Sequence, residues 1–192
     1  MKFSTLFTFF ISLAQPLTIV YGSSNTALSE SKNTEQVAIE ILDTMAERLR
    51  LMPEVAKWKA INNKPIDDFK RENQLLQKLE KQGASLGLEA EFVRAFFQTQ
   101  FDAAKIYQRQ FIKTNRTKFD VDSVQDLNKV IRPRVTHLTN KILNLLSDLK
   151  NTGLTPEQIK KLFDQNSGRL REFDEEVSKK SLEPFRSLSL II

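Results

Sequence analysis

Two cations occupy the apolar side of the first predicted helix. Over residues 34–62 the apolar side chains recur with helical spacing, and both Arg48 and Lys59 fall within their stripe. The two cations stand eleven positions apart in the sequence, a rise of roughly 16 Å along a helix, and Pro53 predicts a kink between them. Burying a cation without a partner is costly. These two positions therefore suggest a site for an anion.

The next predicted helix repeats this anomaly with charges of both signs. Asp68 and Glu72 fall inside its apolar arc and Arg71 lies on the edge. The arc is otherwise formed by Phe69, Leu75, Leu76 and Leu79. In the third predicted helix, Gln108 lies in the middle of a stripe of phenylalanine, alanine and valine. A buried amide needs hydrogen-bond partners, so this glutamine is a further candidate site residue.

Each of these inward polar residues also has an ordinary structural explanation. A lysine or arginine can extend from the edge of a stripe to solvent, and a core glutamine can be satisfied by backbone or water. Several such residues on three helices of a small domain favour a shared polar cavity instead. Cations outnumber acids in this set, which points to an anionic ligand. Arginine suits carboxylates, because its guanidinium group binds both oxygens.

The composition makes several other kinds of chemistry improbable. The 192 residues include no cysteine, one histidine and five glycines, with no glycine-rich phosphate loop. Thiol chemistry and disulfides are excluded, and neither a histidine-rich metal site nor a catalytic Ser-His-Asp triad is expected. The single histidine, His137, lies toward the solvent side of its helix pattern and is interpreted as a surface residue. The sequence thus predicts no metal.

Helical periodicity recurs almost everywhere, so the chain is predicted to be all-α, with a single helical domain of about six helices. The tail "SLEPFRSLSLII" is apolar and is predicted to pack on the domain or on a partner. The predicted helices cover residues 34–62, 66–84, 89–115, 123–151 and 155–167, with a weaker helix over 168–181.

The first residues have the pattern of a secretory signal peptide. "MKFSTLFTFFISLAQPLTIVYGSSN" contains an early lysine, a short apolar stretch and small residues near Gly22. A membrane anchor or a buried helix is the alternative, which the shortness of the stretch and Pro16 disfavour. We expect residues 1–22 to be removed, residues 23–192 to form the mature domain, and the product to be periplasmic or secreted, with no membrane association after cleavage.

Three stretches of the sequence resemble the all-helical chorismate mutase family, type II. The first is "AERLRLMPEVAKWKAINNKPIDDFKRENQLLQKLEKQG", and the resemblance continues through "LGLEAEFVRAFFQTQFDAAKIYQ" and, more loosely, "LNKVIRPRVTHLTNKIL". It covers about residues 34–150, leaving residues 151–192 as a C-terminal helical extension. A signal peptide with such an extension resembles the secreted subclass, whose site is built within one chain.

The resemblance implies an isomerase that converts chorismate to prephenate by an intramolecular [3,3] rearrangement, without a cofactor. It implies that Arg48, Arg71 and Arg132 bind the substrate carboxylates. Lys59 and Gln108 would flank the ether oxygen, on which charge develops as the C–O bond breaks. A homodimer is the family tendency.

By the same resemblance, Asp68 and Glu72 would contact the ring hydroxyl or orient the cations. Periodicity alone does not choose between Arg132 and Arg134, which flank one apolar stripe, but the "IRP" context favours Arg132. Some family members have a hydroxyl residue where this chain has Ala104, so a hydrogen bond made there is absent or supplied by backbone.

Two other functions fit parts of the sequence. The first is a secreted helical protein that binds an anionic metabolite or partner without turning it over. The second is nucleic-acid binding, for which the formal charge of +5 would be suitable. Such binding needs cations on an exposed face with interleaved aromatics. Here the notable cations are predicted to point inward, so no nucleic-acid partner is expected.

Overall fold

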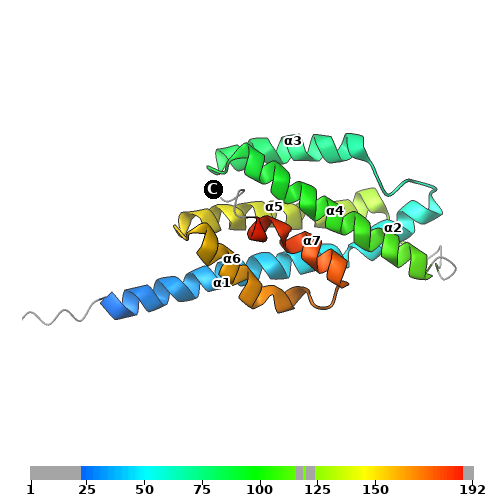
Figure 1. Ribbon diagram of the computed structural model, residues 1–192. Helices are drawn as coiled ribbons and strands as arrows, with labels where there is room; N and C mark the ends of the chain where they lie inside the picture. The colour runs from blue at the N-terminus through cyan, green and yellow to red at the C-terminus, as the bar shows by residue number, and fades with distance from the viewer. Residues whose placement is uncertain (1–22, 116–118, 120–123, 188–192) are drawn as a thin grey trace, which may run out of the picture.

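The chain is a succession of helices joined by short segments (Figure 1). The computed structural model describes residues 23–115, 119 and 124–187, and these residues contain no strand, which confirms the all-α prediction. The α-helices are α1 (Ser23–Arg50), α2 (Met52–Ile61), α3 (Phe69–Ser85), α4 (Ala90–Asn115), α5 (Arg132–Asn151), α6 (Pro156–Asn166) and α7 (Glu175–Arg186). The predicted signal peptide lies outside the described residues.

The first predicted helix is two helices in the structure. α1 begins at Ser23 rather than at residue 34, and it ends at Arg50, where α2 follows after Leu51. Pro53 occupies the first turn of α2. Proline has no N–H, and its ring clashes with the carbonyl four residues earlier, so it disfavours a regular helix through this position. The kink predicted at Pro53 is therefore a helix boundary.

Short polar side chains fix the starts of the next helices. The Asp68 carboxylate accepts a hydrogen bond from the Arg71 backbone N–H at 3.1 Å, so α3 begins at Phe69 rather than at residue 66. α4 matches its predicted range almost to the residue. The Asp126 carboxylate likewise caps η2 (Leu127–Ile131), a π-helical turn that leads directly into α5.

The prediction of a helix over residues 168–181 is wrong for its first half and confirmed for residues 175–181. A 3-10 helix, η3 (Ser167–Leu170), follows α6, and α7 begins only at Glu175. The Asp174 side chain accepts from the Glu176 N–H at 2.9 Å and so starts a new helix in the middle of the predicted one.

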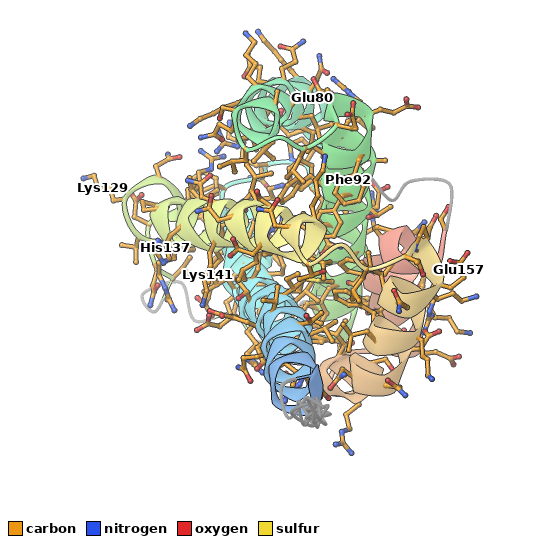
Figure 2. All side chains as sticks on the ribbon, turned by 90° about the vertical axis from the view of Figure 1, so that its left-hand side faces the viewer. Glu80, Phe92, Lys129, His137, Lys141 and Glu157 are labelled. Carbon is orange, nitrogen blue, oxygen red and sulfur yellow. The ribbon has the colours of Figure 1, made fainter. Side chains whose placement is uncertain are left out.

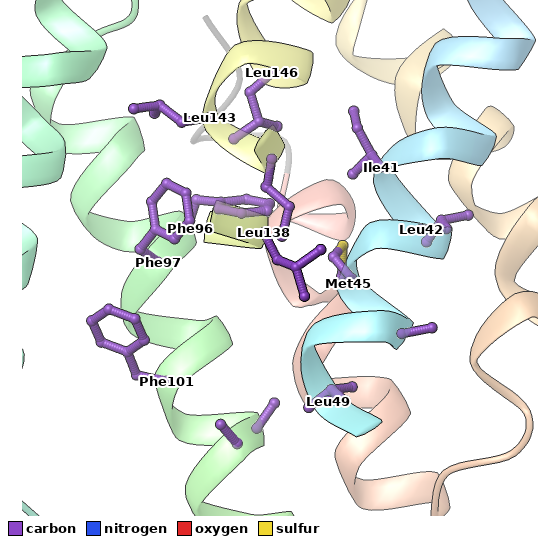
Figure 3. Close-up of a cluster of buried hydrophobic side chains, with 14 of the residues drawn as sticks. Ile41, Leu42, Met45, Leu49, Phe96, Phe97, Phe101, Leu138, Leu143 and Leu146 are labelled. Carbon is purple, nitrogen blue, oxygen red and sulfur yellow. The ribbon is translucent and has the colours of Figure 1, made fainter. Parts of the chain in front are cut away.

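A single buried apolar cluster contains side chains from all seven described α-helices. Figure 3 shows its central part, where α1, α4 and α5 meet through Ile41, Met45, Leu49, Phe96, Phe97 and Leu138. The described part of the apolar tail packs into this cluster, with Phe185 of α7 stacked on Phe163 at 3.5 Å between ring centroids. None of the described helices combines the length and the apolar character needed to cross a membrane.

Candidate active site

A cavity of about 160 Å³ opens between the N-terminal helices and α5. Its walls come from α1, α2, α3, α4, η2 and α5. The structure brings all the sequence-predicted site residues to this one cavity: Arg48, Lys59, Asp68, Arg71, Glu72, Gln108 and Arg132.

Arg48 is a cation buried on the inner face of α1, with only 3% of its surface exposed. Its Nε donates to Thr139 Oγ1 and its Nη1 to the Gln100 carbonyl, both at 3.3 Å, and the guanidinium lies 5.5 Å from the centroid of the Phe101 ring. Burial lowers the pKa of Arg48 to about 10, which leaves it charged at neutral pH. Its described partners are all neutral, so its charge is available to an anionic ligand.

Lys59 reaches the cavity from the last turn of α2. Its Nζ donates to the Ile66 carbonyl at 2.7 Å, which leaves further ammonium protons for a ligand. Burial is the main influence on the pKa of Lys59 and lowers it. Asp68 and Glu72 act in the opposite direction, so this ammonium lies in the electrostatic field of both acids.

Three charged residues come from the first turns of α3. Asp68 caps the helix, and Glu72 forms an ion pair of 2.8 Å with Lys105 of α4. The Arg71 guanidinium, by contrast, makes no hydrogen bond or ion pair with the described residues. The prediction that Phe69 is part of the buried arc is wrong, because its side chain is 73% exposed. With Asp68 as the cap, Phe69 is the first residue of the helix and extends beyond the core.

Gln108 is buried on the inner face of α4, with 4% of its surface exposed. Its Nε2 lies 3.5 Å from the Met52 sulfur, which is a weak acceptor, and its Oε1 has no partner among the described residues. An unsatisfied buried amide costs free energy. This side chain therefore has hydrogen-bonding capacity that a ligand in the cavity could use.

The structure distinguishes between the two candidate arginines of the fourth predicted helix. Arg132 lines the cavity and donates to the Asn128 side chain, whereas Arg134 is exposed and is not part of the lining. Burial, followed by the nearby Arg71, lowers the pKa of Arg132. The π-turn η2 directly precedes Arg132, the first residue of α5. Such turns are frequent at functional sites.

Several lining residues escaped the sequence analysis. Thr136, Thr139 and Asn140 follow Arg132 at helical spacings of four, seven and eight residues, and could have been found by extending that face along α5. Three more polar lining residues could have been found in the same way, because Lys78 and Gln82 follow Arg71 on α3 by seven and eleven residues, and Lys105 precedes Gln108 on α4 by three. Gln82 resembles Gln108 in having a buried Oε1 without a partner in the described part of the chain.

The described residues contain no group of three or more potential metal ligands among histidine, cysteine, aspartate and glutamate. His137 is exposed on the outer side of α5 (Figure 2), as predicted. The polar groups that line the cavity are cations, carboxylates, amides and hydroxyls.

These observations define the class of protein: its described part is all-helical, and it contains a cavity lined by cations. The family model of chorismate mutase type II matches residues 31–109 of this chain. Its fold is that of a chorismate mutase from Burkholderia thailandensis, with a TM-score of 0.69 and 27% identity over 78% of this chain and 98% of that one. The crystal structure of the secreted chorismate mutase from Yersinia pestis shares the fold, with a TM-score of 0.65 and 24% identity over 77% of this chain and 95% of that one.

The relatives found by sequence are also named as chorismate mutases. The "Secreted chorismate mutase" of Yersinia pestis is 28% identical over 53% of this chain and 55% of its own length. The "Bifunctional chorismate mutase/prephenate dehydratase" of Escherichia coli K12 is 26% identical over 54% of this chain. The matched region spans only 27% of that bifunctional relative, so the similarity concerns one part of it.

Proposed function

We propose that this protein converts chorismate to prephenate. The observation that carries the proposal is the convergence of Arg48, Lys59, Arg71 and Arg132 with the unsatisfied amide of Gln108 on one cavity. Chorismate carries two carboxylates and an ether oxygen, so it offers an acceptor to each of these donors. The matches to the chorismate mutase type II family support the same substrate.

In the proposed mechanism the arginines hold the carboxylates and so keep the substrate in its compact reactive conformation. The Lys59 ammonium and the Gln108 amide donate to the ether oxygen, where negative charge grows as the C–O bond breaks and the new C–C bond forms. The rearrangement is intramolecular, so no group is transferred to the protein. Asp68 and Glu72 are proposed to contact the ring hydroxyl or to orient the cations.

We extend the proposal to the processing and assembly of the chain. Residues 1–22 act as a signal peptide, residues 23–192 form the mature domain, and the product is exported and dimeric. A relative named as a secreted chorismate mutase supports export. Mass spectrometry of the N-terminus after expression in a bacterial host tests cleavage near Ser23, and sedimentation equilibrium tests the dimer.

The direct test of the activity is the ultraviolet absorbance of chorismate, which falls on rearrangement. Purified protein starting near Ser23 is expected to accelerate this fall well above the uncatalysed rate. The matched control is Arg134→Ala, which removes an exposed arginine outside the cavity. Binding of prephenate by calorimetry without any turnover of chorismate would contradict the proposal and favour a non-catalytic binding protein.

A further inference from the structure

Lys105 of α4 is held by side chains from two helices. Its Nζ lies 2.8 Å from Glu72 Oε2 on α3 and 3.0 Å from Asp102 Oδ1 on α4. The ammonium also stands 5.7 Å from the centroid of the Phe69 ring, within the range of a cation–π contact. Asp102 is itself fixed by a hydrogen bond from Gln98 Nε2 at 3.1 Å. Only 11% of the lysine side chain is exposed.

The two carboxylates keep this lysine charged in spite of its burial. Burial is the largest single influence and lowers the pKa of Lys105, but the hydrogen bonds to Glu72 and Asp102 outweigh it, and the pKa lies above that of an ordinary lysine. The ammonium is thus a fixed positive charge in the wall of the cavity.

Glu72 has a second cation within electrostatic reach, which is Lys59. One Glu72 oxygen is engaged by Lys105 at 2.8 Å, and the other lies 3.5 Å from the backbone N–H of Asp68. If Lys105 were neutral, the strongest attraction left to the half-buried Glu72 carboxylate would come from the remaining cations of the cavity. A pair between Glu72 and Lys59 would take up an ammonium proton that is otherwise left for the ligand.

We infer that Lys105 is a positioning residue, which holds the Glu72 carboxylate against α4 and so leaves the Lys59 ammonium free to donate to the substrate. Asp102 and Gln98 are the outer part of this arrangement, because they fix the lysine in turn. The inference rests on the proposed mutase activity for its kinetic consequences, but the side-chain arrangement can be tested independently.

The kinetic test is a double-mutant cycle between Lys105→Met and Glu72→Gln. Lys105→Met is expected to lower kcat about tenfold while KM changes less than about twofold, because Lys59 acts mainly as charge develops in the transition state. In the Glu72→Gln background the same substitution should change kcat less than about twofold, since the carboxylate that it would release is gone. Lys105→Arg should retain most of the activity, because a guanidinium can bridge both acids.

Lys57→Met is the matched control for this cycle. Lys57 pairs with Glu54 at 2.6 Å and lies 5.9 Å from the centroid of the Phe111 ring, yet it does not line the cavity. It should leave kcat unchanged. Equal losses of kcat in Lys105→Met and Lys57→Met, or an undiminished loss in the Glu72→Gln background, would overturn the inference. If Lys105→Met does not fold, Lys105→Gln takes its place in the cycle.

A crystal structure of the Lys105 variant separates this inference from the proposed activity. The expected result is a Glu72 carboxylate turned toward Lys59. A carboxylate that keeps its wild-type position would refute the positioning role, whatever the kinetics. Failure of the wild-type protein to convert chorismate would instead refute the proposed function, and the crystal structure would still decide the role of Lys105.

Discussion

Buried polar groups differ in their hydrogen bonding between the cavity and the C-terminal helices. At the cavity, the Gln108 carbonyl oxygen has no described partner and the Arg48 guanidinium is buried without a paired acid. Where α7 packs on α4, the Gln100 amide donates to the Ser181 carbonyl and the Ser181 hydroxyl donates to the Val177 carbonyl, both at 2.8 Å. Buried groups are therefore satisfied in one region and left available in the other.

The C-terminal helices are also held by close packing of aromatic rings. The C-terminal helices bring Phe163 and Phe185 into face-to-face contact, and Phe96 and Phe185 pack in a T-shaped arrangement. Large aromatic side chains of this kind contribute strongly to stability when buried. The contrast indicates that the C-terminal helices stabilise the fold, while the cavity gives up some stability to keep donors available for a ligand. Substitutions should separate these two roles.

The largest effect is expected in the C-terminal helices. Phe163→Ala should lower the free energy of unfolding by about 3–5 kcal/mol, since it leaves a cavity beside Phe185. Chemical denaturation measures this loss, with the exposed Phe69→Ala as control. The folded fraction should keep its wild-type kcat/KM, and a large loss of kcat/KM would break the separation between the regions.

Arg71→Ala should do the reverse, with loss of activity and retention of the fold. The substitution removes charge-assisted hydrogen bonds of about 1.5–3 kcal/mol each, so kcat/KM should fall about 100-fold or more. Unfolding should change little, because the guanidinium pairs with none of the described side chains. Arg71→Lys should recover only part of the activity, because bidentate geometry is lost. An unchanged kcat/KM in the alanine variant would place Arg71 outside the site.

Gln108→Glu should make the activity depend on pH. The introduced carboxylate would repel the charge that develops on the ether oxygen at about pH 7.5, and it could donate only when protonated. The ratio of variant to wild-type kcat/KM must therefore rise toward acid. Assays of both proteins between about pH 4.5 and 8.5 measure this ratio, with the neutral amide of the wild-type protein as the reference. A flat ratio would show that Gln108 is an ordinary core amide.

Arg132→Ala should lower kcat/KM about tenfold, which corresponds to one lost interaction of about 1.4 kcal/mol. Arg134→Ala should have almost no effect, because that side chain is exposed and lies outside the cavity lining. Steady-state assays of the two variants form a matched pair. The reverse order would mean that α5 presents a different face to the substrate.

Thr155→Ala should have the smallest effect and only on stability. Thr155 and Gln158 form a reciprocal cap at the start of α6, with hydrogen bonds of 3.3 and 2.8 Å. Its loss should cost about 1 kcal/mol and lower Tm by about 2–4 °C. Calorimetry measures this shift, and a parallel loss of kcat/KM would link the C-terminal helices to the site.

Local signals in the sequence predicted most of the helices. The proline and threonine at the start of α6 and the periodicity of α4 gave ranges close to those observed. The prediction was wrong over residues 168–174, because the Asp174 side chain caps a new helix that begins at Glu175. The sequence predicted a kink at Pro53, where the structure has a helix boundary. Whether proline bends a helix or ends it depends on the packing of the segments on either side.

The sequence by itself identified a part of the polar residues that face the cavity, because helical periodicity relates residues within one segment: Arg48, Lys59, Asp68, Arg71, Glu72 and Gln108. The resemblance to a family added Arg132 to these. Only the tertiary structure decided that Arg132 rather than Arg134 lines the cavity, and that Lys105 reaches Glu72 across 33 positions of sequence. Periodicity sets the face of a helix, but contacts between helices depend on how each helix is rotated and placed against its neighbours, which only packing of the whole core determines.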